Sequence, residues 1–190
     1  ILAVTAWLPA LAADPGPGAR PAAGSSDSQL ETIVLGTGCF WGAEKFMGML
    51  PGVVDIEVGY ANGDEGVPGN YQAVLAHERA LREGKTKARN HAEVAKITFD
   101  PDQVSLEGVL ARFWEIHDPT QVDQQGPDVG TNYRSAIYTV DEAQLRVARH
   151  SRALYEQALS EAGIGTIVTE IAPLRVYHRA EEYHQDYRKK

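Results

Sequence analysis

Apolar and polar residues follow regular spacings along most of the chain after residue 30, and these spacings predict its elements. Residues 32–35 form a short apolar run that predicts a buried strand, and two glycines separate this run from a predicted helix at residues 40–50. Strict alternation predicts strands at residues 53–60 and 92–99. On the first of these strands, the apolar face would consist of Val54, Ile56, Val58 and Tyr60.

The second half of the chain adds further helices and strands. Apolar residues at helical spacing predict a helix over residues 106–117, which an Asp-Pro pair ends. Residues 120–133 have no period, and an unstructured connection of this length inside a domain is usually functional. The remaining predicted elements are a strand at 134–140, a helix from Asp141 to Gly163 with Gln144 in the capping-box position, and a strand at 166–171.

The order of these elements predicts the fold. As far as residue 140 the order is β-α-β-β-α-β, the split pattern of the ferredoxin-like fold. We therefore expect an α+β two-layer sandwich with an added helix and strand and a long C-terminal coil. Residues 61–70 form a Gly- and Pro-rich loop, 71–75 a brief ordered segment, and 76–89 a charged stretch that we interpret as an exposed excursion.

Length and charge limit the function classes. A chain of 190 residues is long enough for one sizeable core and too short for two independent domains, so a single catalytic domain at residues 29–190 is expected. The net charge of -8 argues against nucleic acid or an anionic membrane surface as a partner. We expect a monomer that is not bound to a membrane in its mature form.

The N-terminal residues predict export. Residues 1–13 are apolar and end in a small-x-small pattern, as before a signal cleavage site, although the usual basic start is missing. The segment is therefore interpreted as a clipped signal peptide. Residues 14–28 are rich in Pro, Gly, Ala and Ser and predict a flexible linker. The predicted location is periplasmic or secreted.

Cys39 is the only cysteine and the first candidate for chemistry. It is expected where the first strand turns into a helix, where free N–H groups and the helix dipole favour a thiolate and lower the thiol pKa below about 8.5. Phe40 and Trp41 follow it and are positioned to wall an apolar pocket. The alternative is an inert thiol buried as a small hydrophobe.

A second group of candidates carries oxygen. Glu93 falls on the apolar face of the strand at 92–99, where desolvation raises a carboxyl pKa, so that Glu93 is a candidate general acid. The alternative is a surface glutamate at a frayed strand end. Tyr71, Asp128 and Tyr133 are candidate hydrogen-bonding partners of a polar substrate, the last two because they lie in the long loop. The C-terminal tyrosines are interpreted as packing residues.

Other chemistries find little support in the sequence. No Cys or His pair has zinc spacing, and no phosphate-binding glycine loop is present. A hydrolase couple of Cys39 and His91 is conceivable, but sequence spacing establishes no contact between them.

Several motifs together resemble one family, the A-type peptide methionine sulfoxide reductases. The resemblance covers the chain from about residue 31 onward. The motifs are Gly38-Cys39-Phe40-Trp41-Gly42, Asn90-His91-Ala92-Glu93, Phe113-Trp114-Glu115-Ile116-His117-Asp118-Pro119, Asp128-x-Gly130-Thr131-x-Tyr133-Arg134-Ser135 and Ala180-Glu181-Glu182-Tyr183-His184-Gln185.

The resemblance implies an oxidoreductase that repairs oxidised proteins without metal or flavin. It implies that Cys39 attacks the sulfur of methionine S-sulfoxide, free or in proteins, and that Glu93 protonates the departing oxygen. By the same resemblance Tyr71 and Tyr133 hold that oxygen and Asp128 organises the site, and Phe40 and Trp41 line the pocket for the methyl group.

This sequence departs from the family pattern in two respects. It has no resolving cysteine near residue 190, so an external thiol, either a thioredoxin-like protein or a small thiol, is expected to reduce the cysteine sulfenic acid. Residues 76–89 also make the segment between Tyr71 and the His-Ala-Glu motif longer than usual. The competing hypotheses are a thiol peroxidase and a ferredoxin-like binding module in which Cys39 is only a core residue.

Overall fold

The computed structural model describes residues 29–187, which fold into a six-stranded sheet, a separate two-stranded sheet and four α-helices. The helices are α1 (Phe40–Met47), α2 (Tyr71–Arg82), α3 (Leu106–Glu115) and α4 (Glu142–Glu161), with 3-10 turns η1 (Thr131–Tyr133) and η2 (Glu182–His184). The strands are β1 (Glu31–Thr37), β2 (Val53–Ala61), β3 (Ala92–Phe99), β4 (Gln124–Gln125), β5 (Asp128–Val129), β6 (Ser135–Thr139), β7 (Glu170–Pro173) and β8 (Tyr177–Arg179). The separate two-stranded sheet consists of β4 and β5. The segments predicted as signal-like (1–13) and linker (14–28) lie outside the described residues.

The sheet has the predicted ferredoxin-like core. Its strand order is β7-β6-β1-β3-β2-β8, and the four inner strands pair antiparallel. The appended strand β7 pairs parallel to β6 at one edge, and β8 pairs antiparallel to β2 at the other. The C-terminal coil thus contributes a short strand to the far edge of the sheet.

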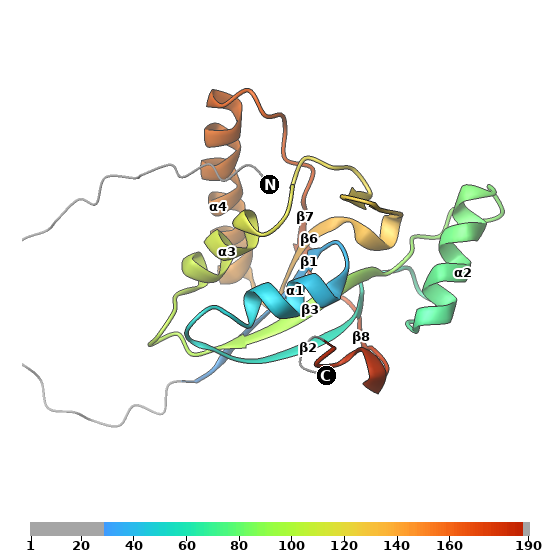
Figure 1. The fold of residues 1–190 in the computed structure, drawn as a ribbon, viewed down its shortest axis with the longest axis horizontal. Coiled ribbons are helices and arrows are strands. Elements are labelled where there is room, and N and C mark those ends of the chain that lie inside the picture. The colour runs from blue at the N-terminus through green and yellow to red at the C-terminus, as the bar shows by residue number, and fades with distance from the viewer. Residues whose placement is uncertain (1–28, 188–190) are drawn as a thin grey trace, which may run out of the picture.

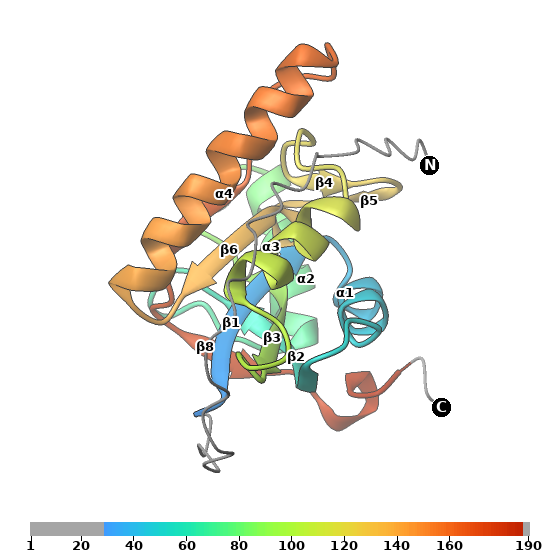
Figure 2. The same cartoon turned by 90° about the vertical axis from the view of Figure 1, so that its left-hand side faces the viewer.

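Apolar side chains cover both faces of the sheet. On one face Ile33 and Ile97 pack under α1, α3 and α4, in the main core cluster with Met47, Leu110 and Ala148. Figure 2 shows α3 and α4 on the same side of the sheet, and the indole N–H of Trp114 joins them by a hydrogen bond to Ser151 of 2.7 Å. Burial of these side chains supplies most of the driving force for folding.

The opposite face of the sheet is covered by non-helical segments of the chain. Val34, Val94 and Tyr138 lie there, and Leu174 and Tyr177 pack over them. Because β7 and β8 lie at opposite edges of the sheet, the segment that joins them crosses this face.

Several sequence expectations need correction. The strand expected at 166–171 begins only at Glu170, as β7, and the connection at 120–133, expected to be unstructured, contains β4, β5 and η1. Val54 is 50% exposed, because a β-bulge between Val53 and Asp55 shifts the register, and Val53 packs against the core instead. Residues 71–82, expected as a brief ordered segment and an excursion, form the helix α2, which Figure 1 shows projecting away from the sheet. Its buried positions are Val74 and Glu78, so no apolar stripe marked it as a helix.

Among residues 29–187, no helix is both long and apolar enough to cross a bilayer.

Candidate active site

Cys39 lies at the turn between β1 and α1, as predicted, and occupies the N-cap position of α1. The preceding residue, Gly38, has φ +88°, and a Cβ there would lie 2.5 Å from the Cβ of Gln125. Only glycine accommodates both the backbone conformation and this contact. At Gly38 the turn therefore lies directly against Gln125 of the long loop.

The pKa of the Cys39 thiol is raised, contrary to the sequence prediction. Burial raises this pKa most, and the negative charge of Glu93 raises it further. Backbone N–H groups of Trp41 and Gly42 lower the pKa, which is the helix-start effect that we expected. Desolvation outweighs that effect because the thiol is half-buried.

Glu93 lies on β3 with its carboxyl group inside the protein, and its side chain is 2% exposed. The Phe40 backbone N–H donates to its Oε2 at 3.4 Å, and the Asn132 side-chain amide donates to its Oε1 at 3.2 Å. Burial raises the pKa of Glu93 to about 7, despite these two donors, which lower it. A substantial fraction of Glu93 is therefore protonated at neutral pH, as a general acid requires.

The loop predicted to be functional lies over this pair. Tyr133 is close enough to Glu93, Asp128 and Cys39 for their negative charges to raise its pKa, which burial brings to about 12. The charge of Asp128 also raises the pKa values of Cys39 and Glu93. The structure thus brings all four of these residues together at one site.

Aromatic rings line the other side of the site. Phe40 is 2% exposed and packs against Tyr60 and His184, with ring centroids 5.6 and 5.1 Å away. Trp41 stacks on Tyr187 with ring centroids 3.7 Å apart and an interplanar angle of 5°. The predicted pocket aromatics therefore form one continuous group with the C-terminal segment.

Tyr71 joins this group from the start of α2. Its ring meets His184 edge-on at 4.9 Å, and its backbone N–H donates to Glu181 at 2.9 Å. His184 contacts Phe40 and Trp41 as well, so Tyr71 lies against the same aromatic group as the pocket residues.

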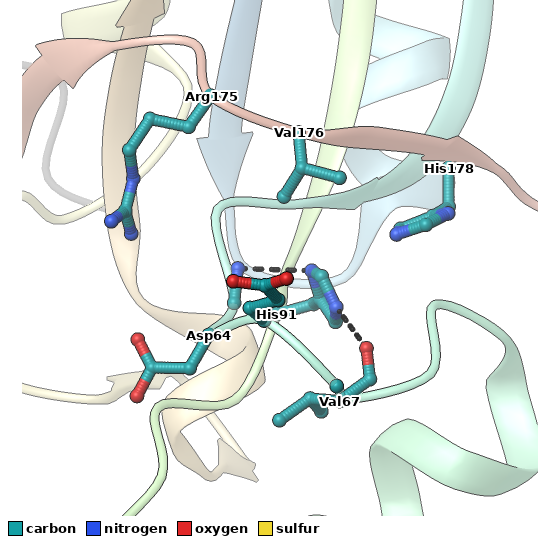
Figure 3. Close-up of a pocket in the computed structure, with 9 residues that line it drawn as sticks. Asp64, Val67, His91, Arg175, Val176 and His178 are labelled. Atoms are coloured by element: carbon teal, nitrogen blue, oxygen red, sulfur yellow. Dashed lines mark hydrogen bonds between the residues drawn. The ribbon is translucent and has the colours of Figure 1, made fainter.

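His91 is excluded as a partner of Cys39. Its Nδ1 accepts from the Gly63 N–H at 2.9 Å, and its Nε2 is 2.8 Å from the Val67 carbonyl oxygen, which fixes it as a donor. Figure 3 shows both bonds beside a cavity of about 380 Å³ that His178 and Arg175 also line. Both ring nitrogens are occupied, so His91 serves this loop and not the thiol.

Sequence reasoning missed the contributions of Asn132, His184 and Tyr187 to the site. Asn132 occupies the x position between Thr131 and Tyr133 of the loop motif, and its role depends on a contact with Glu93 of β3. His184 lies within a matched motif, but only the fold shows that its ring meets three of the predicted site aromatics. Tyr187 was interpreted as a packing residue, and the ring that it packs on is Trp41.

Among residues 29–187, no group of three or more His, Cys, Asp or Glu side chains is placed to share a metal ion. A thiol at a helix start and, beside it, a carboxyl group whose pKa burial raises to about 7 are the arrangement expected of a cysteine-dependent enzyme.

Comparison with known proteins gives the family. The family model of peptide methionine sulfoxide reductase matches residues 31–190. A peptide methionine sulfoxide reductase MsrA of Agrobacterium fabrum is 47% identical over 169 residues, which cover 88% of this chain and 73% of the relative. This protein therefore belongs to the peptide methionine sulfoxide reductase family.

Solved structures agree with this assignment. The methionine sulfoxide reductase A of Corynebacterium diphtheriae superposes with a TM-score of 0.73 at 38% identity, over 86% of this chain and 75% of that one. Mxr1 of Saccharomyces cerevisiae in complex with Trx2 superposes with a TM-score of 0.52 at 25% identity, over 85% of this chain and 87% of that one.

Proposed function

We propose that this protein reduces methionine S-sulfoxide, free or in oxidised proteins, to methionine by way of a sulfenic acid on Cys39. The observation that carries the proposal is the buried Glu93 carboxyl, whose pKa of about 7 keeps a proton available next to the only thiol. Family membership supplies the substrate class.

The reaction balances with the groups at this site. The Cys39 sulfur attacks the sulfoxide sulfur, the S–O bond breaks, and the oxygen is transferred to Cys39. The sulfoxide sulfur is reduced by two electrons and the cysteine sulfur is oxidised by two. Glu93 donates its proton to the sulfoxide oxygen, which makes the sulfur more electrophilic, and the thiol proton returns to Glu93.

The surrounding residues bind the two ends of the sulfoxide group. Tyr133 and Tyr71 hydrogen-bond the oxygen, and Asp128 organises the polar side of the site. The pKa of Tyr133 is raised to about 12, so its hydroxyl stays protonated and donates at neutral pH. Phe40 and Trp41 form the apolar wall for the methyl group, supported by their packing in one aromatic group.

An external thiol completes the cycle. Two thiol groups reduce the sulfenic acid to the Cys39 thiol, and they leave as a disulfide with one water. A thioredoxin-like protein is the proposed reductant, supported by the yeast relative solved with Trx2 and by the single cysteine within these 190 residues. We propose that the enzyme acts as a monomer. The proposed location is the periplasm or outside the cell, on the strength of the signal-like pattern of residues 1–13.

A stereochemical assay tests the function. The protein is mixed with either epimer of methionine sulfoxide and dithiothreitol, and methionine is measured. We expect reduction of the S epimer, little reduction of the R epimer and none by Cys39→Ser. S-sulfoxide reduction that survives Cys39→Ser would rule the proposal out, and rapid peroxide consumption without sulfoxide reduction would favour a thiol peroxidase.

A further inference from the structure

Helix α2 is attached to the active-site loop through one buried carboxylate. Glu78 is 8% exposed, and its Oε2 accepts both the backbone N–H of Thr131, at 3.0 Å, and the Thr131 hydroxyl, at 2.5 Å. These donors lower the pKa of Glu78 although burial raises it, so the side chain is a carboxylate at neutral pH. Hydrogen bonds to an ionised acceptor are stronger than those between neutral groups.

A second residue of α2 strengthens this attachment. The Arg82 Nε donates to Glu78 Oε1 at 3.1 Å, and the Arg82 guanidinium also donates to the carbonyl oxygen of Val129. Between the two attachment points lies Gly130, with φ +155°, where an added Cβ would be 3.2 Å from the Glu78 carboxyl carbon. The loop backbone therefore lies directly against the Glu78 side chain.

The other end of α2 is also fixed. Asn70 caps the helix by accepting the Ala73 N–H at 3.0 Å, and Glu181 accepts the Tyr71 N–H at 2.9 Å. Within the helix Val74 is buried, and its carbonyl oxygen accepts from the side chain of Asn90 at 3.0 Å. Helix α2 thus carries Tyr71 at its start. It also holds Thr131, the residue before Asn132, and through Thr131 the loop that ends in Tyr133.

The held segment acts directly on the acid. Asn132 follows Thr131 and donates to Glu93 Oε1 at 3.2 Å, which lowers the pKa of Glu93. From the sheet side Arg134 also holds the loop, through the Thr131 carbonyl oxygen at 2.8 Å. Releasing Glu78 removes the α2 side of this support, so that Asn132 loses its fixed position at Glu93 and Tyr133 loses its fixed position near Glu93 and Cys39.

We propose that Glu78 is a positioning residue for sulfoxide reduction, which holds Asn132 and Tyr133 in place through Thr131. The inference rests on the proposed function. It also gives a role to part of residues 76–89, which the sequence alone predicts to be an exposed excursion. A positioning role differs from a purely structural role of α2 because it predicts an effect on the protonation of Glu93 as well as on the rate.

The experiment compares five variants with the wild type by kcat, KM and the pH dependence of S-sulfoxide reduction. In Glu78→Ala we expect kcat to fall about 10- to 100-fold, as for a catalytic group that is out of position, with a smaller change in KM. The pH midpoint that reports Glu93 should move above 7, because a hydrogen bond that lowers the pKa is weakened. Glu78→Gln should lose clearly less than Glu78→Ala, since its amide oxygen still accepts both Thr131 donors, although its amide nitrogen no longer accepts from Arg82.

Thr131→Val removes the hydroxyl donor from the other side of the contact and should change kcat and the pH midpoint in the same direction as Glu78→Ala. The double variant Glu78→Ala/Thr131→Val should be no slower than Glu78→Ala, because both changes break one contact. Glu83→Ala is the matched control, since Glu83 is an exposed residue just after α2 that pairs with Lys85.

Wild-type kcat and pH midpoint in Glu78→Ala would overturn the inference, as would equal losses in Glu78→Ala and Glu78→Gln with the midpoint still near 7. If Glu78→Ala fails to fold, Thr131→Val decides the question, and an unchanged kcat and midpoint in that variant overturn the inference. Failure of the proposed function is distinct, because the wild type itself would then not reduce the sulfoxide.

Discussion

At the scale of single residues, Cys39 and Glu93 influence each other through charge. The carboxylate of Glu93 raises the pKa of the thiol, and burial raises the pKa values of both groups. The reaction needs a thiolate and a protonated carboxyl, so the pair must hold one proton between them. A pair of this kind titrates in two steps that belong to both groups.

The first prediction concerns the pH dependence of kcat/KM. Below pH about 7 both groups are protonated, and above the thiol pKa, which is raised from its ordinary value of 9.0, both are ionised. We expect kcat/KM to rise about tenfold per pH unit below 7 and then to stay level until the thiol pKa is reached. Measurements in constant ionic strength buffers from pH 5 to 9 test this, and a decline between pH 7 and 8 contradicts it.

The second prediction concerns Glu93→Gln, which keeps the shape of the side chain and removes its proton and charge. Single-turnover S-sulfoxide reduction should slow by about 10²- to 10⁴-fold, the usual contribution of a general acid. The pH midpoint for alkylation of Cys39 by iodoacetamide should move to lower pH, because the negative charge that raises the thiol pKa is gone.

Glu115→Gln is the control for this variant, since Glu115 is an exposed carboxylate at the end of α3. Equal reduction rates in Glu93→Gln and the wild type would remove Glu93 from the acid role. An alkylation curve that does not move would show that the Glu93 charge does not reach the thiol.

At the scale of elements, the site is assembled from segments far apart in the chain. Helix α1 brings Cys39, strand β3 brings Glu93, and the C-terminal segment is tied to α1 by Glu44. This buried side chain accepts the backbone N–H groups of Asp186, at 2.6 Å, and Tyr187, at 3.1 Å. The bonds hold the Tyr187 ring on Trp41.

The third prediction tests this connection. Glu44→Ala leaves the two N–H groups without their acceptor and should release the Tyr187 ring from Trp41. The apolar wall that Trp41 forms then loses this support. We expect KM for the sulfoxide to rise by up to about tenfold, with a smaller change in kcat, as fits the loss of one or two hydrogen bonds. Acrylamide quenching of tryptophan fluorescence should increase. Lys45→Ala, on the same helix turn, is the control, and an unchanged KM in Glu44→Ala would show that the segment does not shape the site.

How far the sequence predicts these elements depends on where their partners lie. The ferredoxin-like core was predictable because Ile33, Ile97 and Leu110 face one core and follow strand or helix periods. Helix α2 was not, because its inner face packs through the Glu78 carboxylate, which a periodicity of apolar residues does not register.

Part of the candidate site could also be predicted from the sequence, and part could not. Cys39 and Glu93 follow from local pattern, a helix start and a polar residue on an apolar face. The direction of the Cys39 pKa shift did not follow, because burial and the Glu93 charge come from residues distant in sequence. Asn132 was missed for the same reason, since its partner lies on β3.

At the scale of the whole molecule, the site costs stability. A buried carboxyl with a folded pKa of about 7 and an ordinary value of 4.5 favours the folded state most when it is protonated. This contribution is fully present below pH 4.5 and is lost as pH rises through 7. The difference between the two pKa values corresponds to about 3 kcal/mol.

The fourth prediction follows from this linkage. The free energy of unfolding of the wild type, relative to that of Glu93→Gln, should fall by about 3 kcal/mol between pH 4.5 and 8. Other carboxylates titrate alike in both proteins, so the difference isolates Glu93. Urea unfolding at each pH measures it, and a constant difference between the two proteins would show that Glu93 is not held neutral in the folded state.

The central claim is that Cys39 itself takes the oxygen from the sulfoxide. Reduced enzyme, free of other thiols, is mixed with methionine S-sulfoxide, trapped with dimedone and digested for mass spectrometry, while methionine is measured in the same sample. We predict one dimedone-labelled Cys39 for each methionine formed, and no label when the sulfoxide is omitted. Methionine formed in the first turnover while Cys39 remains a free thiol would contradict the account.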